Sequence, residues 1–283
     1  MRYIRMSPIV LLLFLGSPVS LIAQDQANKN EAASQDQSQN QCLSTNPFGY
    51  DHSASGQVAW CGKCNSGSRQ APINIPSNTP ESSLPAIEFI GYREPTNLII
   101  YNNPYNLKVE NKNPLNVIRI GGTVEFKLVE FHFHRPSEEA IDNHRFPMIV
   151  HLLYKKDGCA IGDAGCVAVI AILIEQGRPA QKTSDLLRIL FQHFPPPIGE
   201  QKGVQIMLDG LLPLKPENKS SYGYYRYDGS LTTPPCTENI TFYLLKPPLK
   251  FSAEQIAEFE RHYPSPNARD IQPLNGRKIE NRY

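Results

Sequence analysis

The sequence predicts a single mainly β (α+β) domain over residues 42–283, with a few short helices. From residue 42 onward, short apolar or alternating runs are separated by proline, glycine and asparagine, which is typical of strands joined by turns. The chain of 283 residues is long enough for two domains, but no internal linker and no repeat at a fixed period divides this part. The expected strands are, in order, LIIYNN, LKVENK, NVIRIGG, VEFKLVEFHFH, MIVHLLY, VAVIAILIE and NITFYLL.

The N-terminal residues predict export. Arg2 and Arg5 precede an apolar stretch, and a cleavage site follows Ala23, so residues 1–23 are expected to be a signal peptide. An uncleaved membrane anchor is the alternative, but the apolar run is too short to span a bilayer. Residues 24–41 contain no large apolar residue and predict a flexible polar leader, because they cannot bury enough surface to offset the entropy of ordering.

Two segments favour helices. The first is roughly 182–191, opened by Thr183 and Ser184, and the second is 252–262, where Ser252 and Gln255 have the spacing of a capping box. The remaining connections are expected to be turns and loops.

The charge of the chain excludes one class of partner. The formal net charge is only +1, and the charged residues are scattered rather than gathered into a basic stripe. We therefore expect no nucleic-acid partner.

Six cysteines in an exported chain indicate disulfides, although fifteen connectivities are possible. Cys159 and Cys166 bracket a glycine-rich loop between two apolar runs, so a staple across a hairpin is the simplest local pairing. Free buried thiols are the alternative.

Three histidines suggest a metal site. His132 and His134 are two residues apart in VEFHFH, so on a strand they share one face with Glu130, whereas Val129, Phe131 and Phe133 face the core. Such a pair alone is more often buried polar structure or a weak surface site. His151 in MIVHLLY reaches the same point only if the two segments are neighbouring strands. Three neutral imidazoles with one open position are typical of catalytic zinc.

A second motif, YDGSLTTPPCTENITF, lies near the C-terminal end. Asp228 and Gly229 predict a turn, and the two prolines after Thr233 are typical of a loop that enters a strand. A plain loop does not explain why the motif occurs together with the three histidines.

Together, FHFH, PSE, the later histidine and GSLTTPPC resemble an α-class carbonic anhydrase of the exported, bacterial type. The similarity extends from Phe48 to Ile279 and includes GYD, Trp60, RQAPINI and IQPLNGRKI. It implies a central, mostly antiparallel twisted sheet of about ten strands, with peripheral short helices and a conical active-site cleft. It also implies the reversible hydration of carbon dioxide to bicarbonate and a proton.

The resemblance implies the following roles. His132 and His134 bind Zn²⁺ through Nε2 and His151 binds it through Nδ1, which keeps the full charge of the cation. Water on such a zinc ion has a pKa of about 7, a value for which this family is itself the standard example, so hydroxide is available to attack carbon dioxide. Thr232 accepts a hydrogen bond from that hydroxide, and Glu138 orients Thr232. The carbon dioxide pocket is implied to be formed by Thr233, Leu231, Val169 and Leu153.

Two departures concern the partners of the zinc ligands. Glu130 is placed to orient His132, where related chains usually have glutamine. Relatives commonly have a glutamate two residues before the third histidine, but this chain has Ile149. Because outer carboxylates orient metal-binding imidazoles, we expect weaker zinc binding, and we expect Ile149→Glu to slow chelator-driven zinc loss.

A third departure concerns proton transfer. Tyr105 in NNPYNL occupies the position of the proton-shuttle histidine of relatives. Tyrosine has a pKa of about 10 and is not expected to relay protons near pH 7, so Tyr105 is expected only to pack at the cleft mouth. Proton export would then depend on buffer or on another group, for which His52 is a weak candidate.

Other positions follow from the resemblance. Glu139 and Ala140 stand where relatives often have histidine and threonine, and Phe242 stands where they often have tryptophan; these residues are expected to tune the surroundings of the metal. The resemblance pairs Cys64 with Cys236, which leaves Cys42 for Cys61.

The sequence therefore predicts an exported zinc enzyme, periplasmic or secreted, with carbon dioxide and bicarbonate as small-molecule substrates. It is expected to be a monomer or homodimer, with no stable membrane insertion after signal cleavage. The rival is a catalytically weak or inactive binding domain with the same fold, which loss of a zinc histidine would favour.

Overall fold

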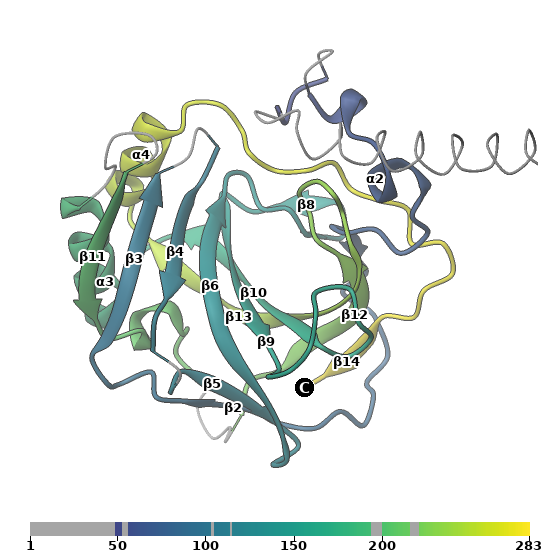
Figure 1. Ribbon diagram of the computed structural model, residues 1–283, viewed down its shortest axis with the longest axis horizontal. Coiled ribbons are helices and arrows are strands. Elements are labelled where there is room, and N and C mark those ends of the chain that lie inside the picture. The colour runs from purple at the N-terminus through teal and green to yellow at the C-terminus, as the bar shows by residue number, and fades with distance from the viewer. Residues whose placement is uncertain (1–48, 53–55, 103–104, 114, 194–199, 216–220) are drawn as a thin grey trace, which may run out of the picture. The chain divides into compact units, whose positions relative to one another are not determined.

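An eleven-stranded, mostly antiparallel sheet dominates the computed structural model, which describes residues 49–52, 56–102, 105–113, 115–193, 200–215 and 221–283 (Figure 1). The path of neighbouring strands is β11-β3-β4-β6-β9-β10-β13-β12-β14, and β5 joins β6 to β2. Only β10 and β13 pair in parallel among these strands. The predicted fold class is confirmed. The strands are β2 (Ile87–Ile90), β3 (Thr96–Asn102), β4 (Leu107–Asn111), β5 (Val117–Ile120), β6 (Val124–His134), β9 (Met148–Lys155), β10 (Val167–Gln176), β11 (Gln201–Ile206), β12 (Tyr224–Ser230), β13 (Glu238–Phe251) and β14 (Glu280–Arg282).

The central strands are buried on both faces. In β9, Met148, Val150 and Leu152 belong to one apolar core, whereas Ile149 and Leu153 belong to a second core on the opposite face. A strand covered on both sides has no polar alternation, which is why MIVHLLY and VAVIAILIE are nearly continuous apolar runs.

Two helices cover the first core, and both were predicted. α3 (Gln181–Gln192) and α4 (Ala253–His262) contribute buried leucines and a phenylalanine to it. The capping box of α4 is present: the Ser252 hydroxyl accepts from the Gln255 amide. The predicted opening of α3 is wrong, because Ala180 is its N-cap residue and the Thr183 hydroxyl instead donates to the Gly210 carbonyl.

The remaining short elements were not predicted. Their apolar patterns are too short to identify from sequence. They are η1 (Gln57–Ala59), α2 (Lys63–Ser66), η2 (Asp209–Leu211) and a three-stranded sheet of β1 (Asn74–Ile75), β7 (Ala140–Ile141) and β8 (His144–Arg145).

A β-bulge in β6 decides where the histidines point. The pairing with β9 shifts by one residue between Leu128 and Glu130. Val129 is the extra residue and is 37% exposed, so the prediction that it faces the core is wrong. Because side chains alternate with period two, this insertion keeps Phe126 and Leu128 in the first core and turns the later even-numbered residues to the other face.

The predicted turn at Asp228 and Gly229 is also wrong. Both residues lie within β12, opposite Thr241 and Ile240 of β13. The glycine serves close packing: a Cβ at position 229 would lie only 3.0–3.2 Å from Tyr227, Ala71 and Phe242.

Two predicted disulfides are confirmed. Cys64 is bonded to Cys236 across 172 residues, and Cys159 is bonded to Cys166 across the loop between β9 and β10. Cys61 is disulfide-bonded, but Cys42 lies outside the described residues, so that pairing stays a prediction.

The predicted signal peptide, 1–23, and the polar leader, 24–41, also lie outside the described residues. Within the described part, the helices are all too short or too polar to cross a membrane.

Candidate metal centre

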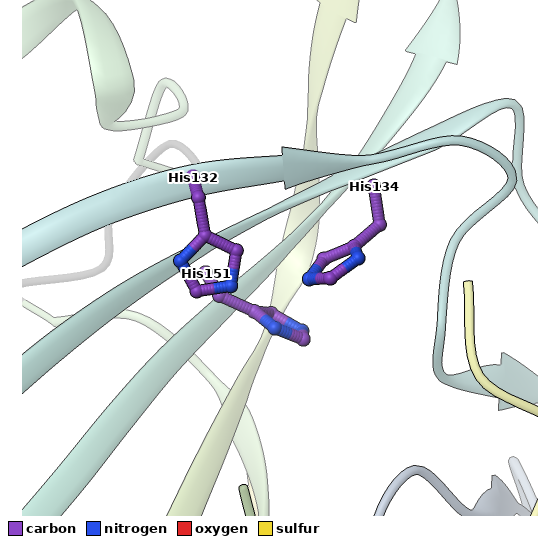
Figure 2. Close-up of side chains that lie close together, drawn as sticks. All are labelled: His132, His134 and His151. Atoms are coloured by element: carbon purple, nitrogen blue, oxygen red, sulfur yellow. The ribbon is translucent and has the colours of Figure 1, made fainter. Parts of the chain in front are cut away.

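Two adjacent strands bring the three histidine rings together. His132 of β6 lies directly opposite His151 of β9, and His134 follows two residues later on the same face. Directly opposite residues have Cβ atoms about 5 Å apart, so this register places the rings within reach of one another. Figure 2 shows the rings converging, and one nitrogen from each lies within 4.8 Å of the others.

His132 has its partner on its own strand. Its Nδ1 lies 3.0 and 3.1 Å from the two carboxylate oxygens of Glu130, so Nε2 is left for the shared space. Burial would raise the pKa of Glu130, but His132 outweighs it and the pKa is lowered. The predicted orienting contact is therefore present.

His134 is held by the backbone. Its Nδ1 donates to the Asn267 carbonyl oxygen at 2.7 Å. Its Nε2 is buried and forms no hydrogen bond within the described part of the chain, although Glu138 Oε2 lies 3.3 Å away. Burial, followed by the neighbouring rings His132 and His151, lowers the pKa of His134 well below its ordinary value, which favours the neutral ring that a metal requires.

His151 corrects the expectation that the isoleucine at 149 leaves this ring without an acidic partner. Its Nε2 lies 3.1 Å from Oε2 of Glu139, so Nδ1 faces the shared space. The other oxygen of Glu139 accepts a 2.7 Å hydrogen bond from the Tyr227 hydroxyl. Burial disfavours charge on both groups, yet their attraction raises the pKa of His151 and lowers that of Glu139.

The donor set fits zinc. Each ring has one nitrogen occupied by a partner and the other turned inward, and His134 Nε2 is a buried polar atom that has no hydrogen-bond partner among the described residues. Three neutral imidazoles and an open side are the ligand set of catalytic zinc sites.

Glu138 lies beneath the rings and is fully buried. Its Oε1 accepts from the Arg269 amide at 2.9 Å. Burial raises the pKa of Glu138, and His151, the Arg269 amide and Thr232 oppose that rise. The Arg269 guanidinium donates to the backbone carbonyls of Ala71 and Cys64. Arg269 therefore links Glu138 to the Cys64–Cys236 disulfide, which holds the Thr232 loop.

A cavity of about 250 Å³ opens above the rings. The four residues predicted to bind substrate, Leu153, Val169, Leu231 and Thr233, all line it together with Thr232. Phe242 lines it too, with its ring 5.8 Å from that of His151. Sequence reasoning missed the lining residues Asn106, Lys108 and Ile161, because nothing in their local sequence marks them as facing the cavity.

The proton-transfer candidates lie at and beyond the mouth. Tyr105 lines the cavity, and burial raises its pKa, which makes it a poorer relay near neutrality. His52 lines a different hollow, where its side chain is 70% exposed and its Nε2 lies 3.5 Å from Asp270. His52 is therefore not among the residues that line the metal cavity.

Known proteins identify the family. The chain matches the eukaryotic-type carbonic anhydrase family over residues 55–283. It belongs to this family. It is 35% identical over 218 residues to a carbonic anhydrase of Pectobacterium carotovorum, covering 76% of this chain and 81% of that protein. The chain is thus an α-class carbonic anhydrase, an enzyme that hydrates carbon dioxide.

Solved carbonic anhydrases have the same fold. One is the carbonic anhydrase Cah3 from Chlamydomonas reinhardtii in complex with acetazolamide, with a TM-score of 0.70 and 31% identity over 83% of this chain and 98% of the other. Another is the α-carbonic anhydrase from Thermovibrio ammonificans with the inhibitor sulfanilamide, with a TM-score of 0.69 and 27% identity over 82% of this chain and 98% of the other.

Several site residues were missed by sequence reasoning. Asn267 and Arg269 act through a backbone carbonyl and a backbone amide that no motif marks, and Tyr227, although it begins the motif YDGSLTTPPC, acts through a hydroxyl whose partner the motif does not indicate. Glu139 carried a signal, because it stands where relatives often have histidine while Ile149 stands where they commonly have glutamate. The presence of both changes in one chain indicates that the acidic partner of His151 has moved from position 149 to position 139.

Proposed function

We propose that this carbonic anhydrase uses Zn²⁺ held by His132 Nε2, His134 Nε2 and His151 Nδ1. The observation that carries the proposal is the convergence of these nitrogens beneath a cavity with an apolar wall. When bound, zinc supplies a nucleophile at neutral pH by lowering the pKa of a water ligand to about 7, the behaviour for which this family is the standard example.

Thr232 and Glu138 are proposed to orient the attacking group. Thr232 lies close enough to the buried Glu138 to interact with it, and the carboxylate form of Glu138 would accept from the Thr232 hydroxyl and leave the hydroxyl oxygen as an acceptor toward the cavity. The reactive lone pair of the attacking oxygen would then have a single orientation. This orientation lowers the entropic part of the activation barrier.

The apolar side of the cavity is proposed to hold carbon dioxide. Leu153, Val169 and Leu231 line this side and offer no strong polar partner, which suits a small apolar molecule. Thr233 is proposed to line the side from which substrate enters.

Proton export is proposed to depend on external buffer. Tyr105 occupies the expected relay position, and its raised pKa keeps its hydroxyl protonated near neutrality. The signal-like residues 1–23 support a periplasmic or secreted location. The protein is proposed to be a monomer or homodimer.

Metal analysis combined with stopped-flow hydration of carbon dioxide tests the proposal. Purified protein should contain zinc, lose its activity when the zinc is removed, regain it when zinc is returned, and be inhibited by acetazolamide. Fully zinc-loaded protein without hydration activity would contradict the proposal. That result would favour the inactive binding domain, which the three converging histidines do not support.

A further inference from the structure

The partner of His151 comes from an unexpected part of the chain. Glu139 lies at the turn into β7, twelve residues before His151, and its side chain is fully buried. Its two oxygens have separate tasks: Oε2 faces His151 Nε2 at 3.1 Å, and Oε1 accepts from Tyr227 at 2.7 Å. A carboxylate held at both oxygens has a fixed orientation, so it also fixes the ring.

The ring of Tyr227 is fixed in turn. It stacks on Phe242 with the ring centroids 4.9 Å apart and an angle of 12° between the planes. Phe242 also contacts the His151 ring edge-on. The carboxylate, the tyrosine and the histidine therefore form one buried, connected cluster.

Ile149 occupies a site that suits no charge. It lies on the same strand face as His151, directly opposite His134 on one side and Leu173 on the other. It is fully buried in the second apolar core, together with Ile73 and Ile75. A glutamate here would add a further buried carboxylate to a site that already holds Glu138 and Glu139, and like charges in one buried site oppose ionisation.

We infer that Glu139 is the positioning residue of His151 and that positions 139 and 149 form an exchanged pair, in which one position or the other accommodates a buried carboxylate but not both. This inference rests on the proposed zinc site. Glu139 holds the proton on Nε2, which directs the Nδ1 lone pair to the metal and raises the basicity of the ring. Ile149 is then the apolar complement of Glu139 rather than a lost anchor.

A double-mutant cycle tests the inference. The variants are Glu139→His, Ile149→Glu and the combination of both, with Glu88→His on the exposed part of β2 as the matched control. The readout is the rate of zinc loss to a chelator, followed by zinc content and independent of catalysis. Each single variant should lose zinc about 10- to 100-fold faster than wild type, and the combination should return to within roughly threefold of wild type.

Several outcomes would overturn the inference. They are faster loss in the double variant than in either single variant, wild-type loss from Glu139→His, and slower loss from Ile149→Glu alone. If Glu139→His does not fold, Glu139→Gln replaces it, because glutamine has nearly the same size and can keep its one oxygen as the acceptor for Tyr227. Its NH2 group then faces His151 in place of the acceptor Oε2, so its zinc loss should still be faster than that of wild type. Wild-type protein that binds no zinc would contradict the proposed function, whereas zinc-loaded, active wild type with unchanged variants would contradict this inference alone.

Discussion

The floor and the mouth of the cavity are built differently. On the floor, His134, Glu138 and Glu139 have no exposed surface, and each is held by partners from distant parts of the chain. At the mouth, Tyr105 is partly exposed and Ile161 is 49% exposed. Substitutions on the floor are therefore expected to lower the free energy of unfolding or the affinity for zinc. Substitutions at the mouth are expected to leave both unchanged and to alter the rate of exchange with solvent.

Removing a floor ligand should have the largest effect. His134→Ala takes away one of three nitrogens and opens a buried hole, so we expect at least roughly a hundredfold loss of zinc affinity and the loss of hydration activity. Competition with a colorimetric chelator measures the affinity. His144→Ala, at an exposed position of β8, is the control and should match wild type. If the His134→Ala variant bound zinc as tightly as wild type, the floor would not be the metal site.

Removing a partner of a floor residue should have the next largest effect. Tyr227→Phe leaves Glu139 Oε1 buried without its donor, so we expect a loss of about 1–3 kcal/mol in the free energy of unfolding. Urea denaturation measures it. Tyr225→Phe removes a hydroxyl from the same strand with a longer, partly buried hydrogen bond, and should cost less. Equal losses of unfolding free energy in the two variants would mean that the hydrogen bonds of the floor contribute no more to stability than those around it.

A change at the mouth should alter kinetics and leave the structure intact. Tyr105→His places a group with a pKa of about 6.5 at the relay position, so hydration at low buffer should rise roughly tenfold, with no gain at high buffer. Stopped-flow rates against imidazole concentration measure both limits. If the hydration rate of wild type does not respond to imidazole, the molecule has an internal proton relay, and residues at the mouth take part in proton transfer.

A third position, at the molecular surface near the Thr232 loop, should show the smallest effect. Glu238 accepts from the Arg69 amide and the Gln70 side chain. Although burial would raise the pKa of Glu238, these donors lower it. The stability it contributes is therefore present above the unfolded pKa of about 4.5 and is lost as pH falls through the lowered value.

Glu238→Gln should accordingly lose less than about 1 kcal/mol near pH 7 and differ from wild type by less still in acid. Unfolding free energies from pH 3 to 7 measure the trend. A difference that grows in acid would reverse the assigned sign.

Sequence patterns predicted what is local. Glu130 was found because it precedes His132 by two residues, and the central strands were found because they are long apolar runs. Glu139 was considered only as a tuning position, because its contact with His151 depends on how the chain turns after β6. Edge strands such as β11 were missed because their exposed residues are polar: QKGVQI has no strand-like apolar pattern.

The extra residue at Val129 gives the enzyme a simple form of modularity. Upstream of it, β6 is an ordinary wall of the first core; downstream, the same strand presents its chemistry to the other side of the sheet. Deletion of Val129 would exchange the faces of all the residues that follow it in β6. The imidazoles of His132 and His134 would then point into the first apolar core, and Phe131 and Phe133 would point into the active site. A single insertion or deletion in this strand is therefore expected to be far more damaging than a paired one, because only a change of two residues keeps the faces that follow it.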